Sequence, residues 1–131
     1  MERARLAAIP LFDGLPEQEL AVVADAASEL EIGAGEALTS EGDFGHALFA
    51  VEAGSAEISI DGTSIGVVGP GDVIGEIAVL ASGRRTASVV ATTPLRVIAL
   101  FKRDVWALDS KAPQAAARLR AELEKHLARA D

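Results

Sequence analysis

Residues 75–89 read GEIAVLASGRRTASV and contain Arg84 and Arg85, the only lysine or arginine residues between Leu6 and Leu95. The same interval contains fourteen acidic residues. Two adjacent cations in so acidic a segment are better explained as a site for one small anion than as ordinary surface charge. Guanidinium suits phosphate because its planar donors match the phosphate oxygens and because it stays charged at any working pH.

The residues from Gly75 to Thr86 have the chemistry expected of a phosphate-binding loop. Residues 76–80 are too few for an independent helix but can form one turn, whose first backbone N–H groups attract a phosphate. Gly75 permits close approach of a ligand, Arg85 can neutralise the phosphate, and Thr86 adds a hydroxyl donor. Arg85 begins an apolar strand and therefore needs a partner at the site, whereas we interpret Arg84 as a solvated loop charge.

Glu76 has two interpretations that the residues alone leave equally open. A carboxylate beside a phosphate is repulsive unless the ligand also offers hydroxyl donors. Glu76 therefore indicates a ligand that carries both a phosphate and sugar hydroxyls. Alternatively, its side chain interacts with the dipole at the start of a short helix.

Length and composition indicate one domain, because 131 residues can bury a core without disulfides and the chain has no cysteine. The net charge of −8 disfavours nucleic acid and anionic membranes as partners. No apolar run can span a bilayer and no signal peptide is visible, so we expect a cytoplasmic location and no membrane insertion. Two isolated histidines, His46 and His126, do not indicate a metal site.

Helical patterns occupy both ends of the chain. The predicted helices are 3–9, 17–27, 102–110 and 114–129. Pro16 and Pro113 can occupy first helical turns. We expect Trp106 to pack inward, and we expect the last helix to bury an apolar stripe of Ala117, Leu119, Leu123 and Leu127.

Glycine and short apolar segments dominate the middle of the chain. Eleven of the twelve glycines fall between Gly33 and Gly83, and Asp61-Gly62 is a hairpin signal. The predicted strands are 30–32, 37–39, 47–51, 56–60, 64–68, 73–74, 86–92 and 95–101. This pattern predicts an α+β fold: an antiparallel β-roll of about eight strands, similar to a jelly roll or double-stranded β-helix, between N-terminal helices and two C-terminal helices.

Residues 75–80 followed by 84–89 closely resemble the phosphate-binding cassette of cyclic nucleotide-binding domains, with matching spacing and no gap. The run GRRTASV is most similar to channel members, because kinase-type and many bacterial cassettes have proline where Arg84 stands. Residues 9–15 resemble the family's N-terminal helical segment, and residues 41–43 and 69–72 resemble its barrel turns.

The resemblance implies one cyclic nucleotide-binding domain over residues 1–131. Its parts would be N-terminal helices in 1–27, a β-roll in 28–101 with the cassette at 75–89, and hinge and lid helices in 102–131.

The resemblance also implies a role for each cassette residue. Glu76 would accept a hydrogen bond from the ribose 2′-hydroxyl, and Gly75 would let the ribose approach. The backbone N–H groups of Ile77 and Ala78 would bind the cyclic phosphate, with Arg85 as its counter-charge.

The remaining implied contacts concern the base and the lid. Thr86, next to Ala87 in the cassette, would contact the phosphate and could reach the exocyclic amine of a syn guanine. Ile58 and Val68 fall where the family packs the base against the barrel wall, although both would be core residues in any barrel. By position the lid residues would come from Leu123, Lys125, His126 and Arg129, but for His126 we favour an exposed helix position.

The function that the resemblance implies is a regulatory module rather than an enzyme. It would bind cAMP in preference to cGMP, although Thr86 keeps cGMP open, and it would need no metal. Occupancy would pass through the C-terminal helix to an effector protein or domain, with no nucleic acid involved.

Two alternatives remain. One is the ligand-binding half of a catabolite-activator-type transcription regulator, which requires a DNA-binding domain that these residues do not include. The other is a degenerate interaction module that binds no nucleotide. Catalysis is disfavoured, because phosphodiester hydrolysis commonly uses clustered histidine and carboxylate metal ligands.

Overall fold

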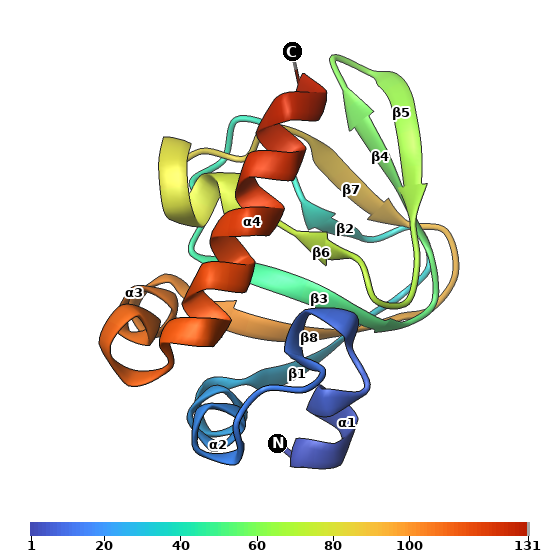
Figure 1. The fold of residues 1–131 in the computed structure, drawn as a ribbon. Coiled ribbons are helices and arrows are strands. Elements are labelled where there is room, and N and C mark those ends of the chain that lie inside the picture. The colour runs from blue at the N-terminus through green and yellow to red at the C-terminus, as the bar shows by residue number, and fades with distance from the viewer. Residues whose placement is uncertain (131) are drawn as a thin grey trace.

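The computed structural model describes residues 1–130 and the side chains up to Leu127. Within this range eight strands form two four-stranded antiparallel sheets that enclose a roll (Figure 1), which confirms the predicted α+β fold. The sheet orders are β1-β8-β3-β6 and β2-β7-β4-β5. The strands are β1 (Ser28–Ile32), β2 (Ala37–Thr39), β3 (Ala47–Ala53), β4 (Ala56–Ile60), β5 (Thr63–Val68), β6 (Val73–Ile74), β7 (Ser88–Ala91) and β8 (Leu95–Phe101).

The β4–β5 hairpin shows how local sequence determines the pairing. Its two turn residues, Asp61 and Gly62, have φ angles of 51° and 78°. Two consecutive residues with positive φ are typical of a type I′ turn, whose twist matches the flanking strands. The hairpin pairs Ala56 with Val68, both of which face the roll's interior core.

The roll has its own apolar core, and a second core lies between the roll and the helices. Interior residues come from both sheets, for example Phe49 and Val97 from one sheet and Val89 from the other. The second core joins the outer face of β3 and β8 to the helical elements. These elements are α1 (Arg3–Ala7), η1 (Pro10–Phe12), α2 (Glu17–Ala26), η2 (Ala78–Ser82), α3 (Lys102–Lys111) and α4 (Pro113–Ala130).

The N-terminal half of α4 is anchored to the N-terminal helices. Glu19 on α2 is 7% exposed, and its Oε1 accepts hydrogen bonds from the backbone N–H groups of Gln114 (2.8 Å) and Ala115 (3.0 Å). A carboxylate at this position satisfies two N–H groups of the first helical turn and complements the helix dipole. Arg118 adds hydrogen bonds to the carbonyls of Leu11 (3.1 Å) and Asp13.

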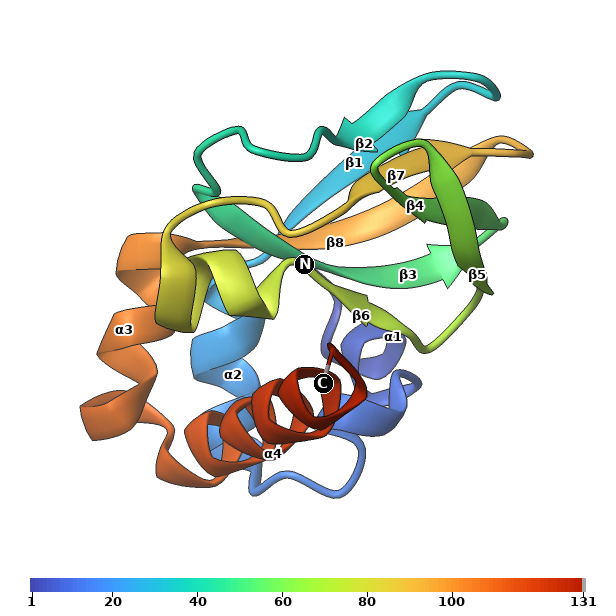
Figure 2. The same ribbon diagram turned by 90° about the horizontal axis from the view of Figure 1, so that it is seen from above.

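From this anchor α4 runs along one side of the roll, past η2, toward the end of the roll where the β4–β5 hairpin lies (Figures 1 and 2). No helix in the described part of the chain is both long and apolar enough to span a membrane.

The structure corrects three details predicted for the C-terminal helices and the cassette strand. Trp106 is 58% exposed, because Val105 and Leu108 form the buried face of α3. In α4 the buried face is made by Ala115, Ala116 and Leu119, whereas Ala117 and Leu127 are exposed. The strand predicted from residue 86 begins at Ser88, because residues 84–87 form the connection that brings Arg85 to the roll.

We predict that Glu19→Ala lowers the free energy of unfolding by about 2 kcal/mol, because two N–H groups of α4, one buried and one partly buried, lose their acceptor. Denaturant unfolding measures the change. Glu17→Ala on the same helix is the control, since Glu17 is exposed and its pair with Arg3 contributes about 0–1 kcal/mol. Equal losses in the two variants would contradict the anchoring role of Glu19.

Candidate functional site

The cassette backbone forms a tight turn, a short helical segment and a second left-handed turn. Gly75 has φ +90°, the helical segment begins at Glu76 and widens into the π-helix η2, and Gly83 ends it with φ +76°. The Gly83 N–H donates to the Ala78 carbonyl (2.9 Å). The segment is longer than the single turn that we predicted, because the π-helix extends it to Ser82.

Backbone hydrogen bonds fix the position of Arg85 against the loop before β3. The Arg85 N–H donates to the Asp43 carbonyl (2.7 Å), and the Arg85 carbonyl accepts from the Gly42 N–H (2.9 Å). A third bond joins the Gly45 N–H to the Gly83 carbonyl (3.0 Å). The backbone that carries the guanidinium is therefore held in place by hydrogen bonds on both sides of the loop.

The Arg85 side chain is buried with few polar partners. The residue is 9% exposed, its Nη1 donates to the Gly75 carbonyl at 3.4 Å, and its guanidinium lies 5.3 Å from the centre of the Phe49 ring. No described carboxylate lies within salt-bridge distance of it. Burial lowers the pKa of Arg85, while the charge of Glu76 acts in the opposite direction. A buried cation with one weak hydrogen bond is a strong candidate for binding an anion.

Two glycines make room for this guanidinium. A Cβ on Gly75 would lie 2.3 Å from Arg85 Nη1, and a Cβ on Gly45 would lie 3.2 Å from Arg85 Cζ and 2.4 Å from the Ala78 Cβ. Gly75 was predicted to allow ligand approach, and the structure adds that it admits Arg85. Gly45 and Phe49 were not predicted as part of the site. A glycine before a strand and an aromatic residue within it are common, and neither marks a site in the sequence.

Glu76 is the second buried charge of the site. The residue is 2% exposed, its Oε1 contacts Nδ1 of His126, and its Oε2 is buried without a hydrogen-bond partner among the described residues. Our preference for an exposed His126 is therefore wrong: the ring is 24% exposed and reaches back from α4 onto the cassette. The sequence could not show this, because the register of the last helix against the cassette depends on the anchor at Glu19.

The structure separates the two cassette arginines. Arg84 is exposed, donates to the Gly42 carbonyl (3.0 Å) and lies 4.0 Å from the centre of the exposed Phe44 ring. Arg84 is thus a loop charge on the surface, as its sequence context indicated.

The other predicted site residues lie around the same cassette with different exposures. Ala78 is buried, Ile77 and Ala87 are half-buried, and Thr86 is exposed. The Ala87 carbonyl accepts a hydrogen bond from Thr39 Oγ1 (3.0 Å), which ties the cassette to β2.

Ile58 and Val68 both pack with the interior core of the roll, Val68 buried and Ile58 partly buried. Ile58 on β4 pairs with Gly66 on β5 and Val89 on β7. Both residues are therefore part of the barrel wall, and contact with a base remains a prediction.

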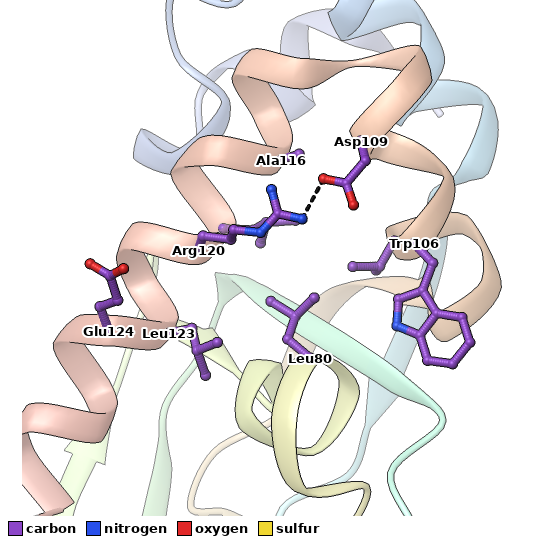
Figure 3. A pocket seen from close by; sticks show the side chains of 9 residues that line it. Leu80, Trp106, Asp109, Ala116, Arg120, Leu123 and Glu124 are labelled. Atoms are coloured by element: carbon purple, nitrogen blue, oxygen red, sulfur yellow. Dashed lines mark hydrogen bonds and ion pairs between the residues drawn. The ribbon is translucent and has the colours of Figure 1, made fainter.

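The predicted lid residues do not act as one group. Leu123 lines a cavity of about 250 Å³ between α3, α4 and the cassette residue Leu80 (Figure 3). Lys125 is exposed and lies 3.9 Å from Glu122, and the side chain of Arg129 lies outside the described side chains. His126 alone among the described members of the group reaches the cassette carboxylate.

The donor set of the site suits an organic anion better than a cation. Among the described residues no three histidine or carboxylate side chains come together as metal ligands. The combination is one buried guanidinium, one buried carboxylate with a free oxygen, and backbone N–H groups at the start of a helical turn.

Comparisons with known proteins agree with this geometry. A family model described as "Cyclic nucleotide-binding domain" matches residues 29–111, which include the whole cassette. The chain is 32% identical over 127 residues to the cyclic AMP receptor protein of Thermus thermophilus, a match covering 93% of this chain and 59% of that protein. It is 38% identical over 113 residues to a cAMP-dependent protein kinase regulatory subunit of Aspergillus niger, covering 79% and 26% respectively.

A solved structure shows the same arrangement. The catabolite activator protein of Thermus thermophilus matches with a TM-score of 0.81 at 32% identity, covering 93% of this chain and 60% of that one. The chain spans less than two thirds of the length of these relatives. The matched family model, the cassette and the β-roll together show that the chain belongs to the cyclic nucleotide-binding domain family.

Proposed function

We propose that this chain is a regulatory module that binds cAMP in preference to cGMP and transmits occupancy through α4. One observation carries the proposal: two buried charged side chains of the cassette, Arg85 and Glu76, lack full partners within the described chain. A cyclic nucleotide supplies the two groups that would satisfy them, an anionic phosphate and a ribose hydroxyl.

In the proposed complex Arg85 binds the cyclic phosphate, with help from the N–H groups of Ile77 and Ala78. Each of these groups lies on an element that the cassette already holds rigidly, so little ordering is needed on binding. Glu76 accepts from the ribose hydroxyl through a carboxylate whose burial makes the hydrogen bond strong. Ile58 and Val68 provide the apolar wall for the base.

The preference for cAMP rests on the relatives, because the position of Thr86 favours neither base. The bacterial and fungal relatives are named for cyclic AMP. Thr86 is exposed at the edge of the cassette, where it can serve a phosphate or a base. Parallel calorimetric titrations with cAMP and cGMP show which nucleotide binds with higher affinity. A tighter complex with cGMP would contradict the proposed preference.

A second candidate function is an interaction module that binds no nucleotide. The contact between His126 and Glu76 favours it, because the chain itself supplies a partner for the carboxylate. The two candidates differ in the same titration: no heat and no thermal stabilisation with either nucleotide would leave only the interaction module.

We predict that Arg85→Ala weakens cAMP binding about 30- to 1,000-fold, since a buried charge-assisted contact contributes about 2–4 kcal/mol. The fold should persist, because the guanidinium makes only one weak hydrogen bond to the described residues. Calorimetry measures the affinity and thermal unfolding checks the fold. Arg84→Ala is the matched control, and we expect it to bind nearly as tightly as the unaltered chain. If Arg85→Ala keeps full affinity for cAMP, the assignment of Arg85 to the binding site is wrong.

We also predict that Glu76→Gln weakens cAMP binding less than Arg85→Ala does, because Gln keeps an acceptor but loses the charge. The comparison with 2′-deoxy-cAMP tests the assigned partner. Loss of the 2′-hydroxyl should weaken binding to the unaltered chain about 10- to 100-fold. It should weaken binding to Glu76→Gln much less, since the two changes affect the same hydrogen bond. Two fully additive losses would show that Glu76 does not bind this hydroxyl.

A further inference from the structure

The strand β5 forms a free edge of the sheet β2-β7-β4-β5 (Figure 1). It pairs with β4 on one side, and no described strand pairs with it on the other. None of the backbone hydrogen bonds that tie the described loops and turns to the strands involves residues 63–68. The outer side of β5 therefore presents unpaired backbone N–H and C=O groups, which can pair with a further strand.

The sequence of β5 does not protect this edge. Edge strands are commonly protected by lysine, by proline or by being very short. β5 has six residues, TSIGVV, with neither lysine nor proline, and its one irregularity is a register shift in its pairing with β4. Ile65 and Val67 are 59% and 69% exposed. A strand that paired here would cover two β-branched apolar side chains.

The outer face of the sheet beside this edge is largely apolar and is not covered by the helices. The register places one residue from each strand in a row across this face: Ala37, Val90, Glu57 and Val67. The core that holds the helices takes its strand residues from β3, β6 and β8, and Figure 2 shows the helices on that side of the roll. An exposed apolar row at an open edge is typical of an interaction surface.

The charges on this sheet are acidic. Its four strands contain no lysine or arginine. Four exposed carboxylates lie on the strands or next to them: Glu36, Glu41, Glu57 and Asp61. No described cation lies within salt-bridge distance of these carboxylates, and Arg84, which precedes β7, hydrogen-bonds the Gly42 carbonyl instead. A second copy of the chain would bring like charges together here, whereas a cationic partner would complement them.

We propose that the edge of β5 binds an extended basic segment of a partner protein, which adds a fifth strand to this sheet. The unpaired edge requires an extended backbone, Ile65 and Val67 favour apolar residues at alternate positions, and the carboxylates favour lysine or arginine in the same segment. The surface includes neither Arg85 nor Glu76, so the inference goes beyond the proposed function and does not depend on it.

The probe for this surface is a synthetic peptide of about eight residues in which valine and lysine alternate. It should bind the unaltered chain in a fluorescence-anisotropy titration and slow hydrogen exchange in residues 63–68. Two altered peptides serve as controls. One has its two central amides N-methylated, which removes a donor from each edge of its strand, and the other has glutamate in place of lysine. Each should bind at least about tenfold more weakly.

Variants of the chain test the location of the surface. Ile65→Lys places a cation at the exposed edge and should weaken peptide binding at least about tenfold, because it repels the lysines and removes an apolar contact. Phe101→Lys is the matched control, since Phe101 is also exposed, at 48%, but lies on β8 in the other sheet. It should bind the peptide as the unaltered chain does.

A second pair of variants tests the charge. Asp61→Asn removes one carboxylate but keeps a residue that suits a type I′ turn, so the hairpin should persist. It should weaken peptide binding about two- to fivefold, as expected for one exposed ion pair. Asp25→Asn on α2 removes an exposed carboxylate outside the surface and should leave peptide binding unchanged.

The results decide between the occupants of the edge. Peptide binding that is weakened by N-methylation and by Ile65→Lys supports the basic strand. No binding of the valine–lysine peptide, equal binding of the glutamate peptide, or equal binding by Ile65→Lys overturns it. Sedimentation equilibrium tests the second copy: a dimer of the unaltered chain that Ile65→Lys abolishes would show that the edge pairs with itself, and would also overturn the basic partner.

Titration with cAMP separates this inference from the proposed function. Ile65 faces away from the interior of the roll, so Ile65→Lys should bind cAMP with an affinity within about twofold of the unaltered chain. An absence of cAMP binding by the unaltered chain, together with peptide binding that Ile65→Lys weakens, would overturn the proposed function alone.

Discussion

The buried guanidinium of Arg85 is the constraint on which the cassette depends. Removing a cation from water costs several kcal/mol, and the one hydrogen bond of the guanidinium to the described part of the chain, at the Gly75 carbonyl, is long. The surroundings are nevertheless shaped for it: Gly75 and Gly45 lack the Cβ atoms that would collide with it, and the Phe49 ring lies beside it. An apolar side chain at this position would be less costly to bury, so stability alone does not account for the arrangement. The proposed phosphate would account for it, because the anion would supply the partner that the described residues do not provide.

The helix α4 connects this site to the rest of the molecule in two physically different ways. Its start is fixed by the carboxylate of Glu19 and by Arg118, which tie it to α2 and η1. Its later turns meet the cassette at His126 and at the cavity lined by Leu80 and Leu123. A helix fixed at one end could take up more than one position at the other without disturbing the core. Transmission of occupancy needs two such positions with similar free energies.

Much of the fold was predictable because local signals repeat along the chain. Short alternating segments between glycine turns gave all eight strands nearly to their ends, and Asp61-Gly62 gave the hairpin. The burial of Arg85 against the roll was predictable because it is an isolated charge at the head of an apolar strand, whereas its role as a site residue stays a prediction.

The wrong predictions concern how elements pack against one another, which local sequence patterns do not encode. Periodicity alone did not show that Val105 and Leu108, rather than Trp106, would face the core. The position of His126 depends on where α4 begins and on the α2 side chain, Glu19, that binds the start of α4. These residues lie far apart in the sequence. Gly45 and Phe49 matter only because residue 85 arrives beside them.

The two buried charges of the cassette are not equivalent in the free chain. The ring of His126 contacts one oxygen of Glu76, where the proposed ligand would place a hydroxyl group. No described carboxylate pairs with Arg85. A phosphate bound at Arg85, as proposed, would displace none of the described carboxylates, whereas a hydroxyl bound at Oε1 of Glu76 would have to replace the imidazole of His126.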